Sequence, residues 1–246
     1  MRPSRAKPFD SAAEPADGSA SGRFDALPLL VWLSPAFPIG SFAYSHGIEW
    51  SVEVGDVVCA ASLHDWITDL LEHGGPWADA VLLAHAYRAS ERDDDHGLTE
   101  VAELALALAP SRERRLETEQ QGSAFLTAIA AGWPWDGLDR VRALLGEAVA
   151  LPVAVGVVAA GHRLAAEPTI AGYLMALASN LVSAAVRLVP LGQTDGVRVT
   201  AALASLVRTT ATRAARASLE DVGGCAFRSD IAAMRHETQT TRLFRS

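Results

Sequence analysis

The stretch SLHDWITDLLEHGGP, residues 62–76, decides the fold class of this chain. Its large apolar residues recur every three or four positions, a spacing that gathers them on one face of an α-helix. Ser62 and Asp65 resemble a capping box at the start of that helix, with aspartate in place of the usual glutamate. The Gly-Gly pair ends the helix, and Pro76 suits the first turn of a following one. The stretch therefore predicts two consecutive helices joined by a tight turn.

Outward from this stretch, apolar stripes and helix-ending residues alternate along the chain. Proline often separates one predicted helix from the next, because it lacks the N–H that a helix interior needs. The predicted helices span residues 76–90, 98–109, 111–131, 138–149, 153–166 and 169–189, and a last one has Thr194 or Asp195 as its N-cap. No stretch reads convincingly as a strand. We therefore expect an all-α fold, a single-domain helical bundle of roughly 8–11 helices with short connections.

The N-terminal 26 residues differ in composition from the rest of the chain. They are rich in Pro, Ser, Ala, Asp and Gly, and they lack the apolar core of a signal peptide. We expect a disordered leader over residues 1–26, followed by one all-helical domain over residues 27–246.

Charge, lysine content and cysteine content exclude several classes of function. The formal net charge is −8, which argues against nucleic acid as a main partner, since phosphate binding needs clustered Lys and Arg. Lys7 is the only lysine and lies in the expected leader, so the folded body has none for a Walker A loop or a Schiff base. Cys59 and Cys225 form no C-x-x-C pair, which fits a reducing, cytoplasmic compartment.

The longest uncharged run, residues 168–186, is nominally long enough to span a bilayer. It contains Pro168, Gly172, Asn180 and several hydroxyl side chains, which favour a buried helix with internal polar contacts. We therefore expect no membrane partner.

Residues 34–50, SPAFPIGSFAYSHGIEW, interrupt the helical pattern. Two prolines three residues apart forbid a continuous helix here. Phe37, Ile39 and Phe42 are thereby placed in a loop, where large apolar residues are unusual. Either the loop packs beneath another part of the chain, which is the favoured interpretation, or another protein covers it.

The C-terminal residues 227–246 reverse the sign of the charge. Four arginines against one aspartate and one glutamate give this segment a net charge of +2, whereas the whole chain carries −8. Ile231, Met234, Leu243 and Phe244 supply apolar anchors. The segment either docks as a helix on its own acidic body or is ordered by a partner protein.

Metal-binding and catalytic motifs are sparse. No histidine pair has the i, i+4 spacing of an H-E-x-x-H site, and neither G-x-S-x-G nor G-x-G-x-x-G occurs. We therefore expect no dedicated metal site, no catalytic residues and no cofactor, and His46 and His236 stay candidates for transient or shared metal coordination. Tyr44, His46 and Glu49 lie within what would be one helical turn, for which a structural role is favoured. Arg187 stands in an apolar run, which indicates a semi-buried arginine that caps helix carbonyls, pairs with a carboxylate or reaches a partner.

Residues 36–50 strongly resemble the N-terminal signature of the urease accessory protein UreF family. Three further segments agree with the family in the expected order: ETEQQGSA at 117–124, VPLGQTDG at 189–196 and DIAAMRHETQ at 230–239. The ending TRLFRS at 241–246 is also similar. The resemblance covers the chain from about residue 27 to its end.

The resemblance implies an all-α, usually dimeric, cytoplasmic chaperone without catalytic activity that assists nickel insertion into urease. It implies three partners: a scaffold called UreD or UreH, the nickel-carrying GTPase UreG, and apo-urease, with the chain bridging scaffold and GTPase. In this picture the segment 227–246 binds the scaffold, and residues 190–193 lie nearer the dimer and GTPase-facing region. One alternative is a regulator of the partner's GTP hydrolysis that uses Arg187. Another is an independent all-α enzyme that uses His46 and Glu49.

The expected partner-binding residues form three groups. The N-terminal loop supplies Phe37, Pro38, Ile39, Gly40, Phe42, Tyr44, His46 and Glu49. The end of the uncharged run and the link after it supply Arg187, Pro190, Gly192 and Gln193. The C-terminal segment supplies Asp230, Met234, Arg235, His236, Glu237, Arg242, Leu243, Phe244 and Arg245.

Overall fold

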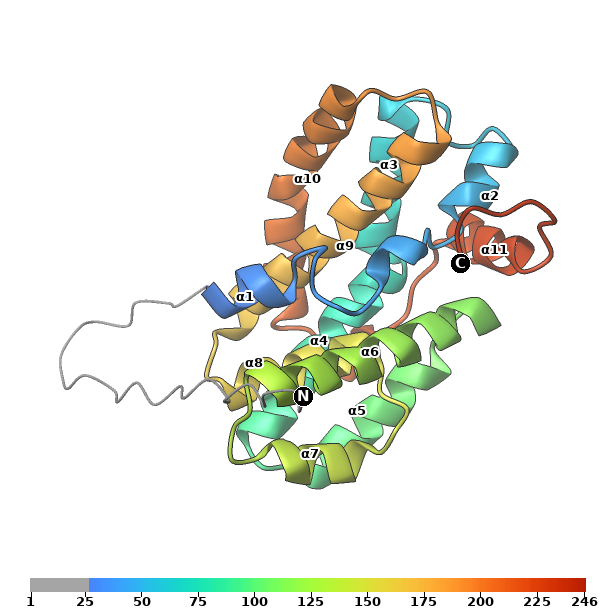
Figure 1. The fold of residues 1–246 in the computed structure, drawn as a ribbon. Helices are drawn as coiled ribbons and strands as arrows, with labels where there is room; N and C mark the ends of the chain where they lie inside the picture. The colour runs from blue at the N-terminus through green and yellow to red at the C-terminus, as the bar shows by residue number, and fades with distance from the viewer. Residues whose placement is uncertain (1–26) are drawn as a thin grey trace, which may run out of the picture.

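The computed structural model describes residues 27–246. In this part of the chain there are eleven α-helices, two short 3-10 helices and no strand, which confirms the expected all-α fold (Figure 1). The expected leader, residues 1–26, lies outside the described residues. The elements are α1 (Leu27–Trp32), η1 (Ser41–Ala43), α2 (Ile48–Glu53), α3 (Ala60–His73), α4 (Gly75–Glu91), α5 (Asp95–Ala107), α6 (Arg112–Gly132), α7 (Leu138–Leu145), α8 (Leu151–Gly161), α9 (Ala166–Leu188), α10 (Gln193–Ala214), η2 (Leu219–Asp221) and α11 (Phe227–His236).

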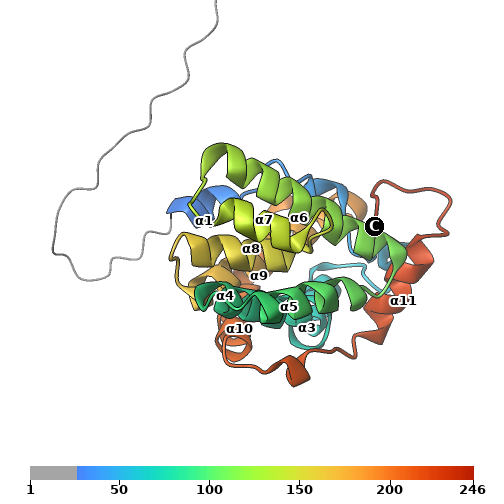
Figure 2. The same ribbon diagram turned by 90° about the horizontal axis from the view of Figure 1, so that it is seen from below.

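The helices pack around α4 and α8. Helix α4 contacts α3, α5, α8, α9 and α10, and α8 lies between α4 and α6. In the view from below, α6 covers α8 on one side and α4 lies on the other (Figure 2). Both central helices are rich in Ala, Val and Leu, which suits helices that are apolar on several faces.

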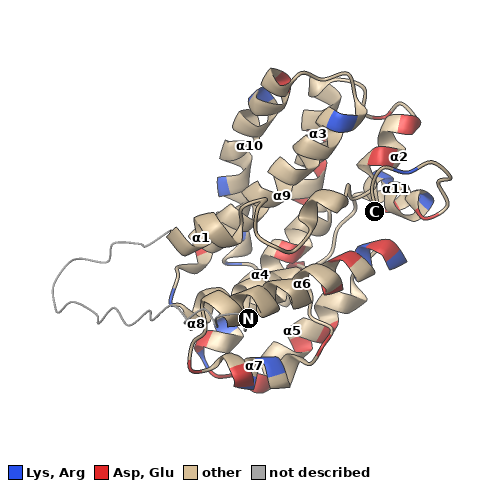
Figure 3. Ribbon diagram, viewed as in Figure 1, with Lys and Arg blue, Asp and Glu red and all other residues tan. Residues whose placement is uncertain are grey.

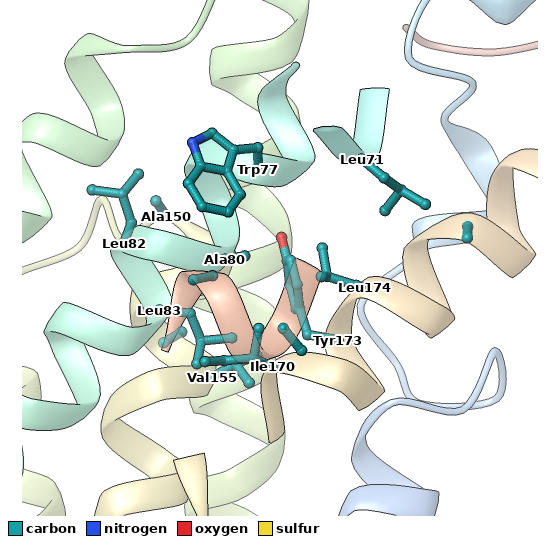
Figure 4. Close-up of a cluster of buried hydrophobic side chains, with 14 of the residues drawn as sticks. Leu71, Trp77, Ala80, Leu82, Leu83, Ala150, Val155, Ile170, Tyr173 and Leu174 are labelled. Atoms are coloured by element: carbon teal, nitrogen blue, oxygen red, sulfur yellow. The ribbon is translucent and has the colours of Figure 1, made fainter. Parts of the chain in front are cut away.

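The core between these helices is a continuous apolar cluster. Leu71 from α3, Trp77 and Leu83 from α4, Val155 from α8 and Leu174 from α9 meet in its interior (Figure 4). Burial of such side chains is the main favourable contribution to folding.

Helix α9 contains the uncharged run. Among the described helices, it alone is long and apolar enough to cross a bilayer by length and composition, and half of its most apolar window is buried inside the protein. It packs against α2, α4, α8 and α10, which is the arrangement of a core helix.

Several predicted helix ends are wrong by a few residues. Helix α3 begins at Ala60, because the N-cap is Cys59 and Ser62 is the third helical residue, whose hydroxyl accepts from the Cys59 amide. The N-cap of α10 is Gly192, so the predicted cap at Thr194 or Asp195 is also wrong. The residues that supply the caps, Cys59 and Gly192, are not those that the usual capping pattern selects, so the predicted starts fall two or three residues late.

The two helices around Pro152 also differ from prediction. Helix α7 ends at Leu145, since Gly146 follows it with φ of 71°. Helix α8 begins at Leu151, so Pro152 lies in its first turn, and it ends at Gly161. Proline is tolerated in a first turn because that N–H has no partner within the helix.

Candidate partner-binding site

The loop between α1 and α2 divides its apolar residues between the core and the surface. Phe37 is buried against Phe125 of α6, with ring centroids 5.4 Å apart, and also lies near Trp133. Ile39 is half-buried against the core, whereas the side chain of Phe42 is 62% exposed. The favoured interpretation, that the loop packs beneath another part of the chain, therefore holds for Phe37 and Ile39 and fails for Phe42.

The prediction that Tyr44, His46 and Glu49 share one helical turn is wrong. Only Glu49 lies in a helix, the first turn of α2, while His46 has φ of 54° in the turn before it. The Tyr44 hydroxyl donates to Gln120 Oε1 at 2.7 Å, and His46 Nε2 lies 2.8 Å from Glu117 Oε1. The left-handed turn thus directs His46 inward, toward α6.

Glu117 is the buried carboxylate at the centre of the site. Its oxygens contact Arg114, His46 Nε2 and Gln121 Nε2, and accept from the Ser246 hydroxyl at 2.7 Å. Burial alone would raise the pKa of this carboxyl, but the Arg114 guanidinium and then His46 lower it to about 2. Glu117 is therefore ionised and draws donors from three parts of the chain.

A small cavity of about 80 Å³ lies beside this carboxylate, between α4, α6 and α9. The Tyr173 hydroxyl donates to Asp79 Oδ2 at 2.8 Å at its polar end. Burial raises the pKa of Asp79, and Arg114 partly offsets that effect. Within residues 27–246, no group of three or more His, Cys, Asp or Glu side chains is arranged to hold a metal ion.

The C-terminal segment folds back onto the protein (Figure 1), and the hydroxyl of its last residue, Ser246, donates to Glu117. Glu49 accepts from the amides of Leu243 at 2.6 Å and Phe244 at 2.9 Å. The main-chain oxygen of Ser246 accepts from the Ser45 amide at 2.6 Å, and the Arg245 amide donates to Ala43 O at 2.8 Å. The segment therefore docks on its own acidic body.

Three polar side chains of this segment contact the first turn of α6. His236 Nδ1 lies 2.7 Å from Glu113 Oε2, and Arg242 donates to Glu113 Oε1 at 2.5 Å. Glu237 Oε1 accepts from the Glu113 amide at 3.2 Å, where a helix N-terminus favours negative charge.

Helix α11 presents two different faces. Ala232, Ala233 and His236 are buried toward the body, whereas Ile231 and Met234 are more than half exposed. Among the remaining predicted residues of the segment, Asp230 is half-buried, and Arg235, Leu243 and Arg245 are exposed. Burial raises the pKa of Asp230.

The expectation for Arg187 is only partly correct. The residue is exposed rather than semi-buried, and it caps carbonyls: it donates to Phe42 O at 3.1 Å and to Ser183 O at 3.3 Å. Its guanidinium also lies 4.4 Å from the ring centroid of Phe244, a cation–π contact. Arg187 thereby joins the end of α9 to both the N-terminal loop and the C-terminal segment.

The other predicted residues lie at the edges of this arrangement. Pro190 and Gly192 lie in the link from α9 to α10, just beyond Arg187, and Gln193 is the first residue of α10. Pro38 and Gly40 shape the loop, and Gly40 has φ of 72°. The structure thus brings the predicted residues of the N-terminal loop into direct contact with those of the C-terminal segment. Arg187 connects both to the link between α9 and α10.

Sequence reasoning missed the side of the site that α6 supplies. Glu113 and Glu117 stand four residues apart near arginines, a pattern typical of a solvated helix face. The one signal was the family-like segment 117–124, which begins at Glu117. Asn180 was also missed; its amide donates to Ser41 O at 3.0 Å.

Comparison with known proteins gives a consistent family. A sequence model described as UreF matches residues 57–204. Among curated proteins, the chain is 59% identical over 218 residues to "Urease accessory protein UreF" of Rhodopseudomonas palustris strain TIE-1, covering 89% of this chain and 91% of that one. It is 52% identical to the protein of the same name from R. palustris strain BisB5 over the whole of both chains, and 55% identical to that of Bradyrhizobium sp. strain ORS 278 over 89% and 90%.

Proposed function

Because the chain belongs to the UreF family of urease accessory proteins, we propose that it is a non-enzymatic, cytoplasmic chaperone of urease maturation. In this proposal it bridges a UreD- or UreH-like scaffold and a UreG-like GTPase on apo-urease, so that nickel is inserted into the urease active site. Nickel is cargo here, and the chain itself holds no cofactor.

The observation that carries the proposal is the outer face of α11. Phe227, Ile231 and Met234 follow one another at i, i+4 and i+7, and their side chains are 67%, 54% and 51% exposed. This is the anchor spacing of a helix that lies in the groove of a partner. The inner face of the same helix is fixed to α2 and α6, so the outer residues are held in place before a partner arrives.

Binding to the scaffold tests this assignment. We expect the triple variant Phe227→Asp, Ile231→Asp and Met234→Asp to lose co-purification with the UreD- or UreH-like scaffold, while the full-length chain retains it. Val197→Asp is the control, since Val197 is equally exposed but lies in α10. The deletion form 1–226 should also fail. Unchanged binding by the triple variant would show that the scaffold contacts another surface.

Self-association is part of the proposal, and α9 supports it. Its outer side between Pro168 and Ser183 is uncharged and only partly covered, and an apolar groove separates it from Leu30 of α1. The uncharged stretch is visible along α9 in Figure 3. A second copy presents the same uncharged face, as a two-fold interface requires. Light scattering on Met175→Glu should give a monomer if this face forms the dimer.

The alternative role for Arg187, completion of the partner's GTPase site, stays a hypothesis. In this structure Arg187 contacts the Phe244 ring and donates to Phe42 O. It would have to leave both partners before it could reach the GTPase site. Equal GTPase rates with the wild-type chain and Arg187→Ala would count against that role. The enzyme hypothesis requires His46 and Glu49 to act together, whereas they bind Glu117 and the C-terminal amides respectively.

A further inference from the structure

Asp79 of α4 and Arg114 of α6 stand between two small cavities. The cavity of about 80 Å³ described above lies on one side of them, and a second cavity of about 60 Å³ lies on the other side, against α11. His46 and Thr118 also line both cavities. The side chain of Arg114 is only 15% exposed, so its guanidinium belongs to a largely buried polar wall.

Neither of these two charged groups uses all of its hydrogen-bonding atoms. In the described part of the chain, the Asp79 carboxyl accepts one hydrogen bond, from the Tyr173 hydroxyl to Oδ2, which leaves Oδ1 without a donor. The Arg114 guanidinium donates through Nη1 to Glu117 and makes no other hydrogen bond to the described residues. Within the same residues, Asp79 and Arg114 form no ion pair with each other. Buried polar groups usually have a partner, so these unused atoms indicate a ligand between them.

The unused atoms specify the chemistry of that ligand. A carboxylate accepts hydrogen bonds and a guanidinium donates them, so a molecule that bridges Asp79 and Arg114 carries a donor beside an acceptor. The ligand is also neutral. A cation would be repelled by Arg114, and an anion would be repelled by Asp79 and by Glu117, whose pKa is lowered to about 2.

The larger cavity adds an apolar surface to this polar wall. Its lining includes Leu33, Phe125, Val155 and Leu177. A buried water needs about two to four polar partners, whereas a small alkyl group gains contact with such side chains. Since a cavity of about 150 Å³ holds benzene, a volume of about 80 Å³ has room for about four heavy atoms.

We propose that the larger cavity is a binding site for a small neutral carboxamide. The carbonyl oxygen of the ligand accepts from the Arg114 guanidinium, and its N–H group donates to Asp79 Oδ1. Its alkyl group packs against Phe125 and Leu177. The ligand thereby joins α4 to α6. This inference goes beyond the proposed function and does not depend on it.

A series of ligands of one shape tests the chemistry on the full chain. Acetamide, acetone, acetate and acetamidinium share one planar framework, but only acetamide is neutral and carries both a donor and an acceptor. Each is titrated near neutral pH, and heteronuclear NMR follows the indole N–H of Trp32, which lines the cavity. We expect acetamide to shift this signal with a Kd of about 1 mM, and each of the other ligands to bind at least about tenfold more weakly.

Two variants and a matched control locate the site. Leu177→Phe places a ring in the cavity and should abolish the shift with acetamide. Leu188→Phe is the same change at another half-buried leucine of α9 that is not part of the cavity lining, so it should bind as wild type. Asp79→Asn removes a negative charge and can offer an N–H to the ligand. It should raise the affinity for acetate relative to acetamide by about tenfold, a gain that loss of structure would not produce.

The proposal is overturned if acetamide gives no saturable shift, which would mean that the cavity holds only water. Equal binding of acetone would overturn the polar contacts, and unchanged acetamide binding in Leu177→Phe would place the ligand elsewhere. An unchanged ratio of acetate to acetamide affinity in Asp79→Asn would remove Asp79 from the site. Because no partner is present, none of these results bears on scaffold binding.

Discussion

At the scale of single residues, two buried glutamates organise the candidate site. Glu49 receives the imidazole and two amides of the C-terminal segment, and Glu117 receives Arg114, His46 and the Ser246 hydroxyl. A buried carboxylate is costly unless donors surround it. Each of these two carboxylates therefore holds residues from distant parts of the chain in place.

Glu117→Gln tests that dependence. The pKa of Glu117 is lowered to about 2 from 4.5, so its contribution to folding is present above pH 4.5 and is lost as the pH falls toward 2. That contribution is roughly 3 kcal/mol at neutral pH, of which roughly 2 kcal/mol disappears between pH 7 and pH 3. Urea unfolding at a series of pH values should show this loss in the wild type and little of it in the variant.

Glu119→Gln is the matched control, because Glu119 lies on the same helix but pairs with Arg115 at the surface. We expect its free energy of unfolding to stay within about 0.5 kcal/mol of wild type. Equal pH dependence in the wild type and Glu117→Gln would mean that Glu117 is not the ionised centre described here.

At the scale of elements, the docking of α11 on α2 depends on one close approach. Gly47 precedes α2 with φ of 77°, and a Cβ there would lie 2.7 Å from the Ala233 amide nitrogen of α11. The left-handed backbone and the contact both require glycine. The outer face of α11 is thereby set at a fixed distance from α2.

Gly47→Ala separates these two requirements when it is compared with Gly55→Ala. Gly55 has φ of 82°, but a Cβ added there would meet nothing within 4 Å, so its change costs only backbone strain, about 1–2 kcal/mol. Gly47→Ala should cost about 1–3 kcal/mol more, because α11 has to move away. Denaturant midpoints give the difference, and exchange of the α11 amides shows where it arises. Equal midpoints would contradict the close packing.

At the scale of the whole molecule, α8 packs against both α4 and α6 and so joins these helices. It crosses α4 where Gly156 meets the Leu83 carbonyl, and a Cβ at Gly156 would lie 2.6 Å from that oxygen. The close crossing lets Val155 and its neighbours fill the core between α4 and α9 (Figure 4).

Gly156→Ala should therefore destabilise the entire protein by about 1–3 kcal/mol, although alanine favours a helix more than glycine does. The melting temperature of the full chain is the measurement. Gly132→Ala, at the end of α6 with nothing within 4 Å, should be neutral or slightly stabilising. A stabilised Gly156→Ala variant would mean that α4 and α8 are not in close contact.

The amino-acid sequence determined the helices and the family. Periodic apolar residues, glycine and proline act on their near neighbours, so the all-α class and most helix positions followed from local patterns. Helix ends at Cys59, Leu145 and Gly192 did not follow, because backbone conformation and packing decide them.

Only the tertiary structure decided how those segments meet. Residues 36–50, 117–124, 230–239 and 241–246 converge on Glu49 and Glu117, and the bond between His236 and Glu49 joins residues 187 positions apart. The sequence alone does not specify which carboxylate receives which donor. The pairing of each carboxylate with its donors depends on burial. In water, solvent would hydrogen-bond to each of these charged groups, and the packed helices exclude that solvent.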